Sequence, residues 1–335
     1  MTETERAQER TLVRKERSLW EESMIRLMKN KVAVGSGIFI IILVLVAIFA
    51  NYIAPYSYAE QDLLANYATP KWMFPLLPAG AEDYAKTTDK FLLGADHLGR
   101  DILSRTIYGA RVSLAMAFVA SFVSLLIGTI YGMIAGYIGG VVDNIMMRIV
   151  DFLYAFPFLI VVILLQTYFK AIARNAGDGL GIGNLFIQWN EDMGGMLFLF
   201  ITIGLINWIG MARIARGQVL SYKEKEFVEA ARAVGSSDTR IIIRHLLPNI
   251  LGPLIVYETL AIPGYIFTEA FLSFIGLGVN PPTPSWGIMI SESVKGLRTY
   301  PTQILIPALA LSITTLAFNF LGDGLRDAFD PRLKE

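Results

Sequence analysis

The sequence predicts an all-helical integral membrane protein with six transmembrane helices. Of its 335 residues, 54% are hydrophobic and only 17% are charged, and the mean hydropathy is +0.51. Soluble domains carry roughly 25% charged residues, so this chain has too little charge to face water on all sides. Apolar runs long enough to cross ~30 Å of hydrocarbon recur along it.

Composition also excludes several classes of function. Lys plus Arg and Asp plus Glu are both 29, and this balance argues against a nucleic-acid partner. The absence of cysteine excludes disulfides, thiolate zinc sites, Fe–S clusters and cysteine nucleophiles. Since there are only two histidines and no G-x-x-x-x-G-K-[ST] loop, we expect this chain to hold no metal, cofactor or ATP itself.

The six spans can be placed from the apolar runs. The first transmembrane helix is assigned to residues 32–54, and a five-helix core is assigned to residues 106–326. The core contains five further apolar runs, at residues 112–142, 152–169, 193–212, 248–278 and 299–322. Six crossings put both termini on the same side of the membrane.

The distribution of basic residues orients the chain. Cytoplasmic segments carry an excess of Lys and Arg. If both termini are inside, 19 of the 29 Lys and Arg residues are cytoplasmic, in segments 1–31, 139–151, 213–247 and 323–335. We therefore predict that both tails, 1–31 and 327–335, are cytoplasmic, and that segment 55–105 is extracytoplasmic.

The segments outside the spans have recognisable patterns. Residues 1–17 are expected to be disordered, whereas residues 18–30 place Trp20, Met24, Leu27 and Met28 on one helical face. This spacing favours a short helix lying in the membrane interface over an ordinary juxtamembrane linker. Segment 55–105 is predicted to be irregular. Segment 170–192, with its alternating glycines, is predicted to be a flexible external loop.

Small residues recur every four positions in the second span, and they predict a close helix contact. Such a ridge lets another helix backbone approach closely. The sequence leaves open whether the partner is another span or a second subunit. The ridge comprises Ala120, Ser124, Gly128, Gly132, Gly136 and Gly140.

Two acidic residues interrupt the fifth span. Glu258 and Glu269 are 11 residues apart, which places them on nearly the same helical face. A buried acid within a span is costly and indicates a functional site by default. Both are candidates for the substrate pathway, and the alternative is an internal salt bridge or a carboxyl group kept neutral.

The loop that follows the fourth span predicts a helix–turn–helix at the cytoplasmic surface. Residues 224–234 form a helix with Phe227, Ala230, Ala231 and Val234 on one face, and Gly235 ends it in the left-handed position. Ser236 can cap a second helix, which is expected to run until Pro248. Such a loop is suited to docking a cytoplasmic partner.

This loop resembles the signature loop of ABC importer permeases. The resemblance rests on Glu229-Ala230-Ala231, on Gly235 and on His245-x-Leu247-Pro248. The histidine departs from the general pattern, which has an aliphatic residue there, and the form is similar to that of the oligopeptide/dipeptide branch. Residues 93–101 resemble the signature that this branch has before its second span, and residues 271–287 and 322–334 resemble its C-type permease subunit.

The resemblance implies a type I ABC importer permease in a prokaryotic cell membrane. Its implied partners are a B-type permease subunit, two cytoplasmic ABC ATPases that bind ATP and Mg²⁺, an extracytoplasmic substrate-binding protein and a peptide substrate. The loop would couple to the ATPases, and a group at the outer mouth would be structural. The coupling residues are Glu226, Glu229, Ala230, Ala231, Arg232, Gly235 and Pro248, and the outer-mouth residues are Asp96, Gly99, Arg100 and Asp101.

Three alternatives to a peptide permease are weighed on the sequence. The first is a permease of the same subfamily for a nickel chelate, glutathione or an opine. The second is a membrane-embedded enzyme, but Glu258 and Glu269 are ~16 Å apart along a straight helix, too far for an acid–base dyad. The third is an independent transporter or channel, which leaves the cytoplasmic loop unexplained.

Overall fold

The computed structural model describes residues 19–175 and 182–330, and the disorder expected for residues 1–17 lies outside this range. The described residues contain helices and short helical turns but no β-strand. The longer helices are α2 (Leu19–Lys29), α3 (Lys31–Ile48), α5 (Ile102–Ile138), α6 (Gly140–Tyr154), α7 (Phe158–Asn175), α8 (Ile182–Asp192), α9 (Met196–Tyr222), α10 (Glu226–Ala233), α12 (Leu247–Phe274), α13 (Trp286–Ser293) and α14 (Thr302–Phe329). The short helices are α4 (Ala50–Ile53) and α11 (Asp238–Arg240).

Five helices are long and apolar enough to cross a membrane, and a bent helix pair supplies the sixth span. The predicted third span, residues 152–169, is wrong in its bounds, because the chain breaks between α6 and α7 and turns through 79°. Pro157 lies at the break, where it has no N–H to continue α6 and disfavours helical geometry in the residue before it.

The helices extend beyond the apolar runs that predicted them. α5 begins ten residues before the run, at Ile102, and α9 continues through Arg213 and Arg216 to Tyr222. At 1.5 Å per residue, the 37 residues of α5 span about 55 Å, well beyond the hydrocarbon core. Hydropathy therefore located the apolar part of these helices, and their polar ends had to be found from the structure.

The small-residue ridge of α5 packs against α9 of the same chain, in the most extensive helix–helix contact of the bundle. Gly128 lies against Met211, Gly132 against Ala212 and Gly136 against Val219. The structure thus identifies the partner that the sequence left open. Gly140 is an exception, because it starts α6 with φ +58° and has no heavy atom within 4 Å of an added Cβ, so it is not part of the packed ridge.

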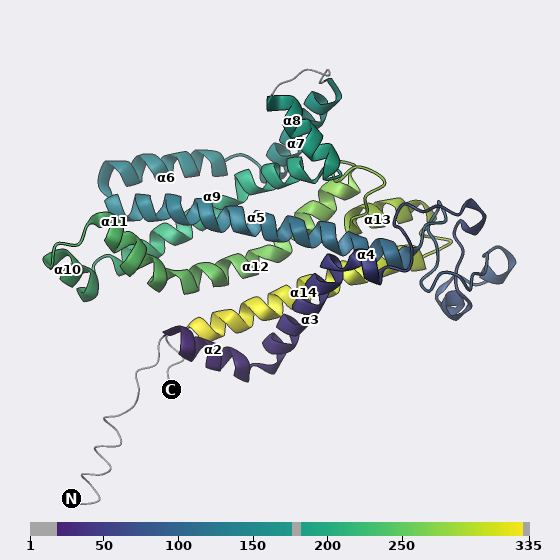
Figure 1. Ribbon diagram of the computed structural model, residues 1–335, viewed down its shortest axis with the longest axis horizontal. Coiled ribbons are helices and arrows are strands. Elements are labelled where there is room, and N and C mark those ends of the chain that lie inside the picture. The colour runs from purple at the N-terminus through teal and green to yellow at the C-terminus, as the bar shows by residue number, and fades with distance from the viewer. Residues whose placement is uncertain (1–18, 176–181, 331–335) are drawn as a thin grey trace, which may run out of the picture.

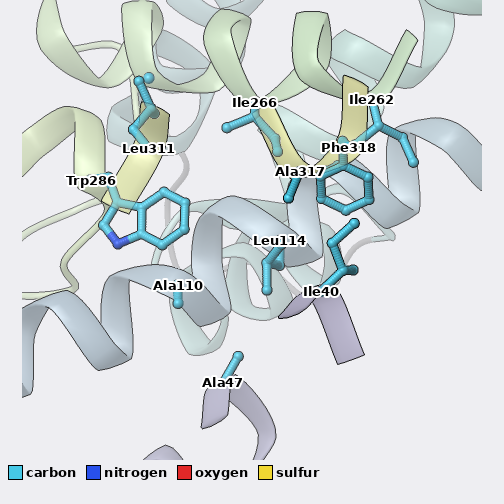
Figure 2. Packing of buried hydrophobic residues seen from close by; sticks show 12 residues of the cluster. Ile40, Ala47, Ala110, Leu114, Ile262, Ile266, Trp286, Leu311, Ala317 and Phe318 are labelled. Atoms are coloured by element: carbon cyan, nitrogen blue, oxygen red, sulfur yellow. The ribbon is translucent and has the colours of Figure 1, made fainter. Parts of the chain in front are cut away.

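A hydrophobic core joins the first and last spans to α5 (Figure 2). Ile40 and Ala47 of α3, Ala110 and Leu114 of α5 and Phe318 of α14 are buried together in it. Burying apolar surface in a membrane does not by itself favour association of helices, so the close fit of these side chains supplies the stabilisation through van der Waals contact.

The two ends of the bundle differ in structure (Figure 1). One end holds α13 and the irregular segment 55–101, whose helical content is three short 3₁₀ turns, as predicted for an irregular segment. The opposite end holds α10 and α11. A cavity of about 750 Å³ at that end is lined by α2, the end of α9, the start of α12 and the end of α14. Both ends of the described chain therefore lie beside the helices that flank the loop 213–247.

Two other segment predictions have mixed outcomes. The helix predicted over residues 18–30 is confirmed as α2, with Met24 and Met28 exposed and the Trp20 ring packed on Phe329. The flexible loop predicted over 170–192 is wrong for its described part, because α7 continues to Asn175 and α8 occupies Ile182–Asp192. Residues 176–181, with three of the four alternating glycines, lie outside the described chain, as do residues 331–335 of the predicted tail.

Candidate functional site

The helix α10 is fixed to the end of the bundle by two small apolar residues. Val228 and Ala231 are buried among Ile241, Leu246 and Ile250. Phe227, Ala230 and Val234, which the sequence placed on the packed face with Ala231, are exposed instead. Residues three apart in a helix share a face, and the pair 228/231 faces inward, so the remaining apolar side chains are left on the outer surface.

The outer surface of α10 combines charged and apolar side chains. Glu226, Glu229 and Arg232 are exposed there beside Phe227 and Ala230. Apolar side chains rimmed by charge are typical of a protein–protein contact. Five of the predicted coupling residues are therefore exposed on α10 or in the turn after it, whereas Ala231 is buried and Pro248 lies apart, at the start of α12.

The turn after α10 requires glycine for its backbone conformation. Gly235 has φ +81°, and an added Cβ would meet no heavy atom within 4 Å. The N–H of Gly235 donates to Arg232 O at 2.9 Å, and the N–H of Ser236 donates to Ala231 O at 3.0 Å. This is the predicted helix end with a left-handed glycine. The cap predicted at Ser236 is wrong, because Ser237 occupies the N-cap position of α11, without a side-chain hydrogen bond.

Pro248 does not end the second helix of the loop. α11 passes into a π-helical turn, η4 (Ile241–Leu246), and then directly into α12, so residues 238–274 form one long helical segment. Pro248 is tolerated because it lies in the first turn of α12, where a missing N–H costs little, and the wider π turn precedes it. The loop is thereby joined rigidly to the fifth span.

Two basic residues of α9 form ion pairs with acidic residues of α6, the helix that precedes the bend of the third span. The Arg216 guanidinium donates to both carboxylate oxygens of Asp143, at 2.5 and 2.6 Å, and Arg213 donates to Asp151 at 2.7 Å. Sequence reasoning treated the arginines only as the end of a span. The sequence does contain an indication of these ion pairs. The two arginines are three residues apart, about one helical turn, and the two acids are about two turns apart on α6, so each pair of residues shares one face of its helix.

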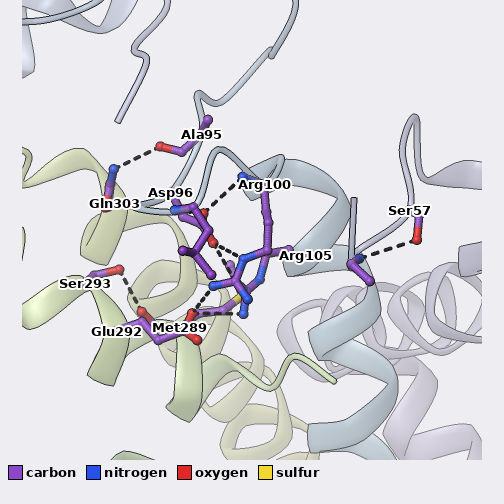
Figure 3. A network of polar contacts seen from close by, with 11 residues as sticks. Ser57, Ala95, Asp96, Arg100, Arg105, Met289, Glu292, Ser293 and Gln303 are labelled. Atoms are coloured by element: carbon purple, nitrogen blue, oxygen red, sulfur yellow. Dashed lines mark hydrogen bonds and ion pairs between the residues drawn. The ribbon is translucent and has the colours of Figure 1, made fainter. Parts of the chain in front are cut away.

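The predicted outer-mouth residues form a buried ionic cluster at the opposite end (Figure 3). Arg100 donates to Asp96 at 2.7 Å and to Glu292 at 2.8 Å, and Arg105 pairs with both acids as well. Arg105 and Glu292 were missed, because they come from the start of α5 and from α13, and only the fold brings them together. This cluster joins the segment 96–105 to α13, which is far away in sequence.

Electrostatics and backbone geometry explain the other members of this group. Although burial acts to raise the pKa of Asp96, the guanidinium groups of Arg105 and Arg100 and two backbone N–H groups outweigh it and hold that pKa below its ordinary value. Asp101 caps α5 by accepting from the Ser104 N–H at 2.8 Å. Gly99 has φ +73°, and a Cβ there would lie 1.8 Å from Asp62 O.

The ionic cluster is not suited to a metal ion. Ligand atoms of Asp96, His97 and Glu292 lie within 4.8 Å of one another. Both carboxylates, however, already accept hydrogen bonds from Arg100 and Arg105, whose positive charges oppose a cation. We therefore assign the cluster a structural role.

Both acids in α12 are buried and accept hydrogen bonds from hydroxyl groups. Glu258 accepts from Ser124 Oγ at 3.1 Å and from Tyr265 Oη at 2.9 Å, and its side chain is buried. Glu269, also buried, accepts from Ser113 Oγ at 2.9 Å and from Ser273 Oγ at 2.6 Å. The bonds from Ser124 and Ser113 join α12 to α5, so each acid has a hydroxyl partner inside the bundle.

Comparison with known proteins identifies the family. Residues 128–335 match "Binding-protein-dependent transport system inner membrane component", and residues 18–70 match "N-terminal TM domain of oligopeptide transport permease C". The chain is 40% identical to the oligopeptide transport system permease protein OppC of Escherichia coli K12, over 94% of this chain and 92% of that protein. It is 39% identical to the glutathione transport system permease protein GsiD of Shigella flexneri, over 95% and 92%.

A solved structure shares the fold. The match is to an inward-facing conformation of the MetNI methionine ABC transporter, at a TM-score of 0.51 and 20% sequence identity, and it covers 68% of this chain and 97% of that chain. The sequence matches extend over both the span-forming core and the α2–α3 region, which the structure packs into one bundle. The chain is therefore a member of the inner-membrane permease family of binding-protein-dependent ABC transport systems, in its oligopeptide permease C branch.

Proposed function

We propose that this chain is the C-type permease subunit of an ATP-driven importer of oligopeptides or dipeptides. It forms the translocation path together with a B-type permease subunit and makes or breaks no covalent bond itself. Two separate ATPases bind ATP and Mg²⁺, and an extracytoplasmic binding protein delivers the peptide. The 40% identity with an oligopeptide permease over 94% of the chain carries this proposal.

In this proposal, both termini and the loop 213–247 are cytoplasmic, and the outer surface of α10 is the ATPase contact. Support comes from the exposed Glu226, Glu229 and Arg232, and from the rigid anchoring of α10 by Val228 and Ala231. A movement of the ATPases is then transmitted along the unbroken segment 238–274 into the fifth span. Alternating access follows from a shift between two conformations that ATP binding favours unequally.

A second candidate cargo is glutathione, because the identity with a glutathione permease is 39% over 95% of the chain. Glutathione is itself a small peptide, so the same fold serves either cargo. Cavity size does not separate the two, since cavities of 640 and 750 Å³ are sufficient for either.

The test is co-purification of the tagged chain, followed by ATP hydrolysis assays in proteoliposomes. We expect a second permease and two ATPases to co-purify, and hydrolysis to rise when the binding protein is loaded with a tri- or tetrapeptide. Stimulation by glutathione alone would assign the second cargo. Solute uptake by the chain in isolation would contradict the ABC importer assignment itself.

A further inference from the structure

A cavity of 640 Å³ with both apolar and polar lining lies beside α13. Its walls come from α7, from the end of α8, from the start of α9, from the end of α12 and from α13. None of the functional residues predicted from the sequence lines it. The volume falls within the range of about 300–1,000 Å³ that is usual for small-ligand sites.

Hydrogen bonds between neighbouring elements fix the shape of this cavity. Lys170 of α7 donates to Gly276 O at 3.2 Å and to Gly278 O at 2.9 Å, just after α12. Ser291 of α13 donates to Phe274 O at 2.8 Å, and the Asn280 N–H donates to Gly194 O at 2.7 Å. The cavity is therefore a built feature rather than a gap between loosely packed helices.

One wall of the cavity carries a buried donor without an acceptor. Gln166 is fully buried, and its Oε1 accepts from Thr202 Oγ1 at 3.4 Å, but its Nε2 has no hydrogen-bond partner among the described residues. A buried amide N–H left unsatisfied costs free energy that a ligand acceptor would recover. The matching ligand group is a carbonyl oxygen.

A second wall carries an acid that is available for a ligand. The other charged groups of the cavity are engaged: Lys170 with two carbonyl oxygens and Glu292 with two arginines. Glu191 lines the cavity and is exposed, and within the described chain no cation lies within ion-pairing distance of it. The matching ligand group is an ammonium ion.

We propose that this cavity is a subsite for the amino-terminal end of a peptide on the import path. Gln166 donates to a main-chain carbonyl oxygen of the peptide, and Glu191 pairs with its terminal ammonium group. Phe198, Val279 and Ile288 provide apolar wall for a side chain of any type. Because main-chain groups and the terminus are recognised, the subsite accepts peptides of varied sequence. This inference rests on the proposed function.

The main test is photocrosslinking in the complete transporter, reconstituted in proteoliposomes with its binding protein. A benzoylphenylalanine at Thr167, which lines the cavity beside Gln166, is compared with one at Leu164, which is 63% exposed elsewhere on α7. Radiolabelled tetra-alanine is the probe. We expect crosslinking at position 167 only, and about a tenfold lower yield with N-acetylated tetra-alanine.

Kinetics supply a second readout that does not depend on the crosslinker. Loss of one hydrogen bond by Gln166→Met, which nearly preserves side-chain volume, is expected to raise the KM for tetra-alanine about threefold to tenfold with little change in kcat. Glu191→Gln is expected to abolish the preference for the free over the acetylated peptide. A variant that changes kcat and not KM would mark these residues as structural.

The outcomes separate this proposal from the proposed function. Uptake of tetra-alanine without crosslinking at position 167, or with equal crosslinking at 164, would overturn the subsite and leave the peptide importer intact. Absence of any peptide uptake by the wild-type transporter would overturn both. Crosslinking that excess unlabelled peptide fails to reduce would also count against a peptide subsite.

Discussion

Gly132 of α5 and Ala212 of α9 are in contact through their backbones, so that a Cβ atom added to Gly132 would lie 2.3 Å from the Ala212 carbonyl oxygen. No side chain can move aside to relieve this overlap, because the atom that is met belongs to the backbone of α9. The close approach of α5 and α9 at this point therefore requires glycine, which has no Cβ atom, at position 132.

Gly132→Ala is therefore expected to destabilise the chain by about 1–3 kcal/mol, the usual cost of overpacking. The readout is the thermal unfolding midpoint in detergent. Gly217→Ala on α9 is the matched control, since no heavy atom lies within 4 Å of a Cβ there and alanine favours the helix. Equal midpoints for the two variants would contradict the close α5–α9 contact.

The ion pair between Arg216 and Asp143 is expected to hold α6 against α9. A double-mutant cycle with Arg216→Gln and Asp143→Asn should give a coupling energy of about 1–3 kcal/mol, because the pair is bidentate and Asp143 is nearly buried. Arg213 and Asp151, whose side chains are 38% and 66% exposed, should couple by less than about 1 kcal/mol. Chemical unfolding of the two single variants and the double variant of each pair, compared with wild type, measures both coupling energies, and a larger value for the exposed pair would refute the assignment.

Asp96 is expected to make the ionic cluster sensitive to acid. Asp96→Asn leaves Arg100 and Arg105 short of a negative charge and should cost about 3 kcal/mol at neutral pH. The folded state lowers the pKa of Asp96, so its stabilisation is complete above the ordinary Asp value of about 4 and is lost as the pH falls through the lowered value. The difference between wild type and variant in unfolding free energy should shrink accordingly, while the exposed Asp89→Asn shows no such trend.

Glu229→Lys tests the proposed ATPase contact. Glu229 is exposed on α10 and takes no part in the buried anchoring by Val228 and Ala231, so the variant should fold and reach the membrane normally. Reversal of a charge within an interface should lower ATP-dependent uptake at least tenfold. Glu60→Lys, an exposed acid in the irregular segment, is the control. Normal uptake by Glu229→Lys would exclude this surface as the contact.

The sequence by itself determined the helical membrane architecture, because a bilayer allows few structures other than apolar helices and their positions follow from hydropathy. It also determined the turn at Gly235, since a left-handed backbone at a helix end selects glycine. The family resemblance could also be recognised from the sequence, because the residues of the exposed loop that carry it are contiguous in the chain.

Contacts between distant segments could be decided only by the tertiary structure. The bend of the third span depends on Pro157 together with the ion pairs to α9, and no single run of residues contains both. Likewise, Arg105 and Glu292 are 187 positions apart and meet only because α13 packs beside the start of α5. The hydroxyl partners of Glu258 and Glu269 are a further case. Ser124 and Ser113 of α5 lie 134 and 156 positions away from these acids and meet them only because α5 packs against α12.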